Sequence, residues 1–129
     1  DVSAFAMEGT IFDFNAAATQ EVEFQGFPGF LWQFALISAR LFHGTDLSET
    51  SAKAGIDSAG TRPMLILHGE IDHRLPYQSS VDFYDYAKSV GADIELESFA
   101  NADHTEGMLT ETDRYAKVLA EFFDRSLAN

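Results

Sequence analysis

PMLILHGEIDHRLP, residues 63–76, is the segment that is most informative about the fold of this chain. Residues 64–67 form an unbroken apolar run between a proline and a glycine, which is typical of a strand buried on both faces of a parallel sheet. The segment that follows, residues 69–76, is rich in turn-forming and titratable side chains. The stretch therefore predicts a buried strand that leads into a loop able to carry chemistry.

A helix and a second strand are predicted after this loop. Residues 77–90 place apolar side chains at helical spacing, and Gly91 stands where a helix would end. The apolar positions of this helix are Val81, Tyr84, Ala87 and Val90. Residues 94–97, IELE, alternate between apolar and acidic side chains, which indicates a strand near a sheet edge with one solvent-exposed face.

The last predicted helix covers residues 110–127. Thr110 and Asp113 have the spacing of a capping box at its start. Its apolar stripe comprises Tyr115, Val118, Leu119, Phe122 and Phe123. Residues 63–129 thus predict the order strand, helix, strand, loop, helix.

A strand, a helix and a strand in this order form the unit that joins parallel strands, so we expect an α/β fold with a doubly wound sheet. Two strands are too few for such a sheet. Either residues 1–62 contain strands that the sequence pattern does not reveal, or the rest of the sheet lies outside this chain.

Residues 1–62 differ in character from the rest, because they hold most of the phenylalanines and the single tryptophan. We expect them to form a mostly helical cap or cover segment. Within them, residues 28–42 predict a helix that is apolar on nearly all sides, and such a helix must be buried by several neighbours. We favour packing in the core for this helix over the alternative, an apolar cover above a pocket.

Composition excludes several classes of function. The 129 residues are 46% hydrophobic and 22% charged, which fits one globular domain. A formal charge of −13 disfavours nucleic acids and anionic membrane surfaces as partners. There is no cysteine, so disulfides and thiolate metal sites are excluded. No apolar stretch is long enough to span a bilayer, and we expect a soluble, cytoplasmic protein.

Titratable side chains follow both predicted strands, at the edge where ligands bind in open α/β sheets. Asp72 lies in the loop after the first strand, and His104 lies after the second. An aspartate and a histidine that meet there can form the orienting half of a nucleophilic triad, because the carboxylate fixes the imidazole tautomer. We expect His68 to be structural at the end of its strand, and Glu70 and His73 to be solvent-exposed.

Residues 63–129 resemble the C-terminal portion of a serine α/β-hydrolase of the small esterase-like or prolyl-oligopeptidase-like type. The resemblance rests on HG at residues 68–69, on DHRLP at residues 72–76, and on a histidine after the following strand. It implies the C-terminal part of a doubly wound α/β-hydrolase sheet. It also implies that Asp72 is the acid of a catalytic triad and His104 its base, and it implies no cofactor.

The sequence departs from this resemblance at the nucleophile. The family carries its serine on a G-x-S-x-G turn upstream of the acid. No serine upstream of Asp72 has these flanking glycines, namely Ser3, Ser38, Ser48, Ser51 and Ser58. Because the chain also begins at Asp1 rather than Met, we expect the C-terminal half of a longer serine hydrolase that acts on ester or peptide bonds through an acyl-enzyme. This chain alone is then expected to be inactive and to self-associate.

Two other interpretations stay open. The first is a non-catalytic, hydrolase-like interaction module that has lost its nucleophile and binds a partner through its apolar first half. The second is a metal site, which we disfavour because the sequence has no H-E-x-x-H helix. The side chains able to supply metal ligands are His68, Glu70, Asp72, His73, Asp103 and His104.

Overall fold

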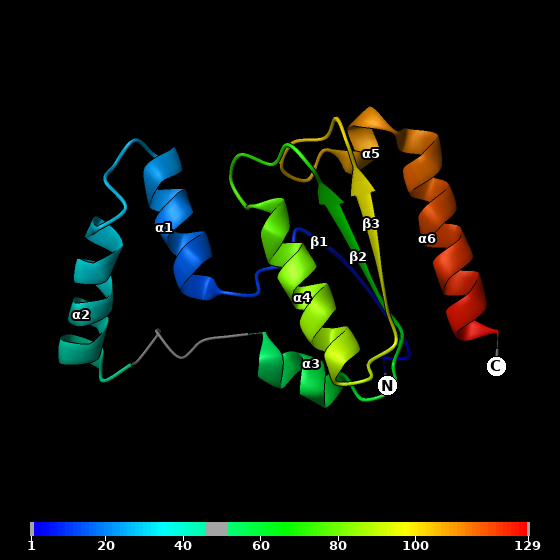
Figure 1. Ribbon diagram of the computed structural model, residues 1–129, viewed down its shortest axis with the longest axis horizontal. Coiled ribbons are helices and arrows are strands. Elements are labelled where there is room, and N and C mark those ends of the chain that lie inside the picture. Colours follow the sequence, from blue (N-terminus) through cyan, green and yellow to red (C-terminus); the bar gives the residue numbers. More distant parts are fainter. Residues whose placement is uncertain (1, 46–51, 129) are drawn as a thin grey trace.

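A computed structural model describes residues 2–45 and 52–128 (Figure 1). It contains three strands among helices, in an order that alternates as expected for an α/β protein. In chain order the elements are β1 (Phe5–Glu8), α1 (Phe14–Phe24), α2 (Leu31–His43), α3 (Lys53–Ala59), β2 (Met64–Gly69), α4 (Tyr77–Ser89), β3 (Ile94–Phe99), α5 (Gly107–Thr110) and α6 (Thr112–Leu127).

The strands form one parallel sheet in the order β1-β2-β3. In its register, Met64 of β2 lies opposite Phe5 of β1 and Ile94 of β3. Every residue of β2 is buried, as its unbroken apolar run predicts, because β2 has a neighbour on each side. In β3 the exposed Glu95 follows the buried Ile94, which confirms the predicted position near a sheet edge.

Strand β1 lies within residues 1–62, which were expected to be mostly helical, and it is a strand of the kind that the sequence pattern does not reveal. The strand has four residues, FAME, all half-buried. Alanine and methionine favour helices over strands, and four residues are too few to display a clear alternation. Pairing with β2 therefore decides the extended conformation here, and the backbone amide of Phe5 begins it by donating to the carbonyl of Pro63.

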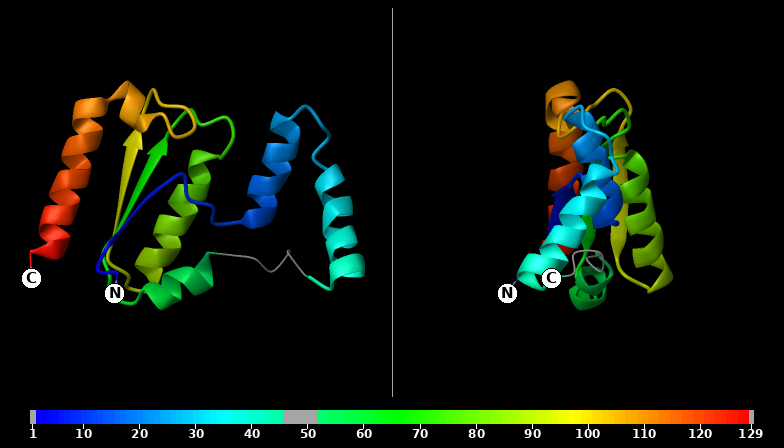
Figure 2. Two further views of the ribbon diagram at one scale, coloured as in Figure 1. Left: turned by 180° about the vertical axis from the view of Figure 1, so that it is seen from behind. Right: turned by 90° about the vertical axis from the view of Figure 1, so that its left-hand side faces the viewer.

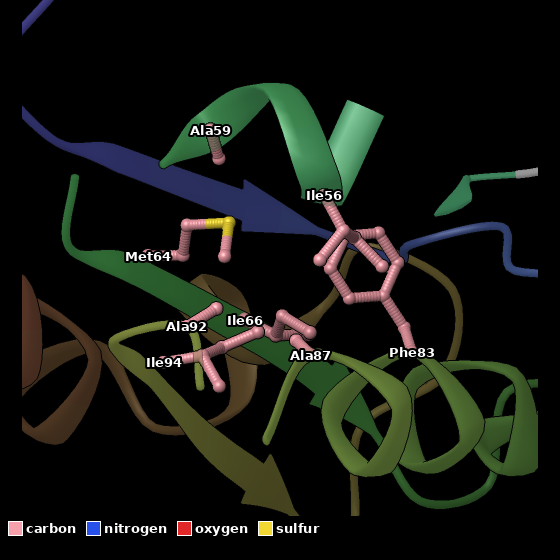
Figure 3. Packing of buried hydrophobic residues seen from close by; sticks show 8 residues of the cluster. All are labelled: Ile56, Ala59, Met64, Ile66, Phe83, Ala87, Ala92 and Ile94. Carbon is pink, nitrogen blue, oxygen red and sulfur yellow. The ribbon is translucent and has the colours of Figure 1, made fainter. Parts of the chain in front are cut away.

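Helices cover both faces of the sheet, as a doubly wound fold requires (Figures 1 and 2). Because side chains alternate along a strand, β2 sends Met64 and Ile66 to one face and Leu65 and Leu67 to the other. The first pair packs with residues of α3 and α4 in a cluster shown in Figure 3: Ile56, Ala59, Met64, Ile66, Phe83, Ala87, Ala92 and Ile94.

The opposite face of the sheet packs against α6, whose Phe122 is buried. The predicted apolar stripe of this helix is confirmed, since its other four members pack against the same cluster: Tyr115, Val118, Leu119 and Phe123. The predicted capping box is wrong. A short helix, α5, precedes α6, and the Thr110 hydroxyl donates to the carbonyl of Glu106, 3.0 Å away, instead of capping α6.

Helix α4 ends as predicted, with Gly91 in the left-handed region at φ +80°. The face that it buries overlaps the predicted stripe in part, at the buried Ala87 and at Tyr84, which packs against the core cluster. Its buried residues are Ser80, Phe83 and Ala87, whereas Val90 is exposed. Ser80 occupies a core position because its hydroxyl forms hydrogen bonds with the buried Thr10 and His68. A hydrophobic pattern does not predict such partners.

Helix α2 contradicts the prediction of core packing. It has no buried residue, and its Leu41 and Phe42 are 74% and 80% exposed. The view in Figure 2 shows α2 beside α1, away from the sheet. An apolar helix needs neighbours on several sides for burial, and among the described residues the main neighbour of α2 is α1.

Among the described residues, no helix is long and apolar enough to cross a membrane.

Candidate active site

The two loops that follow β2 and β3 lie together at the carboxyl edge of the sheet (Figure 1). They approach closely at Gly69, where an added methyl group would overlap the backbone carbonyl of Ala102. The amide of Ile71 donates to that same carbonyl at 3.3 Å, and the amide of Glu70 donates to Phe99 at 3.0 Å. A glycine at the end of β2 therefore allows the backbones of the two loops to pack closely and form hydrogen bonds.

Asp72 and His104 meet between these loops. The Nδ1 atom of His104 lies 2.8 Å from Oδ2 of Asp72. Oδ1 of Asp72 accepts from the backbone amides of Arg74 and Leu75, at 2.8 and 2.7 Å. The Asp72 side chain is 1% exposed and that of His104 is 31% exposed, so a buried carboxylate holds an imidazole that solvent can reach.

This geometry fixes the tautomer of His104. An ionised carboxylate only accepts hydrogen bonds, so Nδ1 carries the proton that is donated to Asp72. In the neutral ring Nε2 is then an acceptor, which is the state that a general base requires. The expectation that the two side chains lie within hydrogen-bonding distance is met.

His68 lies behind this pair and is buried, in the structural position expected for it. Its Nε2 is 3.1 Å from the carbonyl of Leu75 and 3.3 Å from Oδ2 of Asp72, and both of these atoms are acceptors. Nε2 therefore carries the proton, and Nδ1 accepts from the Ser80 hydroxyl at 2.5 Å. The Thr10 hydroxyl lies 2.7 Å from that of Ser80 and extends the buried network to the end of β1.

Asp103 is a residue whose role the sequence did not reveal. Its carboxylate accepts from the backbone amides of His73 and His104 and from the ring of His73. These hydrogen bonds lower the pKa of Asp103 to about 2, with the bond from the His73 amide as the largest cause. No spacing rule marks such a bridge, because Asp103 and His73 are thirty residues apart in sequence.

The six side chains considered for a metal site do not gather around one point. Glu70 accepts from the Ser98 hydroxyl at 2.6 Å, and it is exposed, as is His73. Within residues 2–45 and 52–128, no three histidine, aspartate or glutamate side chains are arranged to hold a metal ion.

A cavity of about 380 Å³ opens beside His104, with α1 as its opposite wall. Its lining residues are Ile11, Phe14, Ala17, Ala18, Glu21, Arg74, Leu75 and His104. Helix α1 is attached to the loop of Asp72, since Arg74 forms an ion pair with Glu21 at 3.0 Å and Gln20 donates to the carbonyl of His73 at 3.1 Å. The site is therefore flanked by an apolar surface with one charged end.

The described serines upstream of Asp72 provide no nucleophile at this site. Ser3 borders a hollow with residues at the carboxyl end of α6, and the Ser58 hydroxyl donates to Gly55 within α3. Ser38 lies within α2, while Ser48 and Ser51 lie outside the described residues. In the part of the chain that the structure describes, no serine hydroxyl hydrogen-bonds to His104.

The chain is similar to one known protein family and to several solved structures. Residues 44–129 match the prolyl oligopeptidase family. An esterase of Pyrococcus furiosus superimposes with a TM-score of 0.70 at 17% identity, over 97% of this chain and 46% of its own. The acylaminoacyl peptidase of Pyrococcus horikoshii gives a TM-score of 0.73 at 20% identity, over 99% of this chain and 20% of its own. No curated protein matches.

These likenesses establish the fold of the chain as that of an α/β-hydrolase. The chain spans less than half the length of the esterase and a fifth of the length of the peptidase.

Proposed function

This chain belongs to the prolyl oligopeptidase family, and from that premise we propose that it supplies the base and the acid of a serine hydrolase for ester bonds. One observation carries the proposal: the 2.8 Å contact between Nδ1 of His104 and Oδ2 of Asp72, at the carboxyl edge of a parallel sheet. Peptide bonds are the alternative substrate class.

In the proposed reaction, a serine Oγ attacks the ester carbonyl carbon while Nε2 of His104 takes the serine proton. The carbon–oxygen bond to the alcohol then breaks, and the same proton passes from Nε2 to the departing oxygen. A water molecule next attacks the acyl-enzyme with His104 again as base, which releases the acid and restores the serine. Asp72 holds the tautomer and stabilises the transient imidazolium.

The nucleophile is proposed to come from polypeptide other than the described residues. This agrees with the lack of a G-x-S-x-G sequence in the chain and with the absence of a serine hydroxyl on His104 among the described residues. The chain by itself is therefore proposed to hydrolyse nothing, and the missing part is proposed as its functional partner.

The cavity beside His104 supports an apolar group in the substrate. Its wall on α1 includes Phe14 and two small residues, Ala17 and Ala18, which leave space, and the charged Glu21 lies on the same helix. Ile11 adds a further apolar surface. Burial of a ligand's apolar groups against such side chains stabilises the bound state. We therefore assign the acyl or aryl part of the ester to this cavity.

A fluorophosphonate probe, which labels activated serines, tests the proposal. We expect no labelling of the 129-residue chain and labelling of a longer protein that contains it. In that longer protein, Asp72→Asn and His104→Ala are each expected to lower kcat on an apolar p-nitrophenyl ester by roughly 10³–10⁴-fold.

The matched controls for these variants are Asp124→Asn on α6 and His43→Ala at the end of α2. Both residues lie outside the site, and both controls should retain wild-type kcat. Labelling of the chain alone would contradict the assignment of the nucleophile. Wild-type kcat in the His104→Ala variant would contradict the proposed base.

The exposed apolar surface of α2 favours a second candidate function, a hydrolase-like interaction module without catalysis. The same probe separates the two candidates. A longer protein that folds but takes up no label, and hydrolyses no ester or peptide substrate, would favour the interaction module.

A further inference from the structure

A single carboxylate joins the loop that carries Asp72 to the loop that carries His104. Oδ1 of Asp103 accepts from the backbone amide of His104 at 2.7 Å and from that of His73 at 3.0 Å. Oδ2 accepts from Nδ1 of the His73 ring at 2.9 Å. His73 directly follows Asp72 in the chain, so each amide that Asp103 holds is next to, or belongs to, a member of the proposed pair.

The backbone beside His104 needs such support. Thr105 has a φ of +55°, and it is the single non-glycine residue with a positive φ in the described ranges. A residue other than glycine adopts this conformation at a cost, and it persists where the surrounding structure holds it. The strained position immediately follows the amide that Asp103 binds.

We propose that Asp103 is a positioning residue that locks the two loops together and so sets the contact between His104 and Asp72. This inference rests on the proposed function of that pair. Three donors converge on one carboxylate, which favours its ionised form. The same hydrogen bonds stabilise the ionised carboxylate, which lowers the pKa of Asp103. Without it, the two backbones would be joined at fewer points, and the imidazole could leave its partner.

The test follows the tautomer of His104 by ¹H–¹⁵N NMR of the imidazole in the 129-residue chain, a readout that needs no activity. In the wild type we expect the Nδ1–H tautomer, which the hydrogen bond to Asp72 selects. In Asp103→Ala we expect a mixture that includes the Nε2–H form. The control Asp124→Ala, on the exposed face of α6, is expected to keep the wild-type signal.

His73→Ala separates the two parts of the bridge. It removes the ring contact with Oδ2 but keeps the His73 amide that donates to Oδ1, so the His104 tautomer should stay close to wild type. If Asp103→Ala fails to fold, Asp103→Asn replaces it in the test, because asparagine keeps one acceptor oxygen. An intermediate population of the two His104 tautomers is expected in that variant. An unchanged tautomer in every folded Asp103 variant would overturn the proposal.

A second readout applies to the hydrolase in its active form. There Asp103→Ala is expected to lower kcat, by up to ~100-fold for a displaced base, with little change in KM. A change in KM alone would overturn the positioning role. If the longer protein proves to hydrolyse nothing, the proposed function fails, while the NMR result still decides whether Asp103 sets the contact of His104 with Asp72.

Discussion

At the scale of single residues, the buried polar groups form one connected system behind Asp72. Thr10, Ser80 and His68 are all buried, and each has a hydrogen-bond partner within the network. Among the described residues, no buried side-chain nitrogen or oxygen lacks a partner. Removal of one member of such a network is costly, because it leaves a buried polar atom unsatisfied.

Ser80→Ala tests this network. The change leaves Nδ1 of His68 without its donor and Thr10 without its partner, so we expect a loss of about 1–3 kcal/mol in the free energy of unfolding. Urea denaturation at neutral pH measures it. The control is Ser89→Ala on the same helix, where the serine is exposed and the expected change is within about 0.5 kcal/mol. Equal losses in both variants would contradict the role of the network.

At the scale of elements, the close approach of the loops depends on the last residue of β2. The ends of β2 and β3 are in register at Gly69 and Phe99, and the loop after β3 crosses directly over Gly69. The apolar pattern predicts where β2 ends, but it does not predict that its final glycine must lack a side chain. That requirement comes from a backbone carbonyl more than thirty residues away in sequence, at Ala102.

Gly69→Ala is therefore expected to be destabilising, by about 1–3 kcal/mol, because rigid backbone has to move to accommodate the methyl group. The matched change Gly55→Ala in α3 meets no atom within 4 Å, and it should stabilise the protein by up to about 1 kcal/mol through higher helix propensity. Thermal and urea unfolding of both variants measure the difference. Equal stability of the two variants would contradict the expected steric overlap between a methyl group at residue 69 and the Ala102 carbonyl.

At the scale of the whole molecule, two surfaces lack cover within the described residues. The first is the apolar side of α2 and its preceding loop, with Phe27, Phe30, Phe34, Leu41 and Phe42 exposed. The second is formed by the two outer edges of the sheet, since β1 and β3 each pair on one side only. Large exposed apolar patches and free strand edges both promote association. The charge of −13 opposes it, and salt weakens that opposition.

We expect the 129-residue chain to self-associate in solution, more strongly as salt is raised. Light scattering measures its mass, and the double variant Phe34→Gln with Leu41→Gln should shift it toward the monomer without a change in net charge. Val90→Gln is the control, since Val90 is exposed and lies at the end of α4, a different helix. A monomeric wild type at high salt would contradict the expectation.

Local features of this protein could be predicted from its amino-acid sequence. Three local patterns predicted the positions of elements: the unbroken apolar run of β2, the glycine after α4 and the apolar stripe of α6. Such patterns are informative because neighbouring residues determine local backbone conformation and the alternation of buried side chains. Asp72 and His104 could be expected to meet, since parallel strands bring their carboxyl ends to one edge.

Features that depend on distant neighbours became evident from the three-dimensional fold. Pairing with β2 made residues 5–8 a strand, and the lack of neighbours left α2 exposed although its sequence predicted burial. The bridge through Asp103 and the partners of Ser80 likewise join residues far apart in the chain. A hydrogen bond or a packed face needs a partner, and local sequence patterns carry no information about which distant residue that partner is.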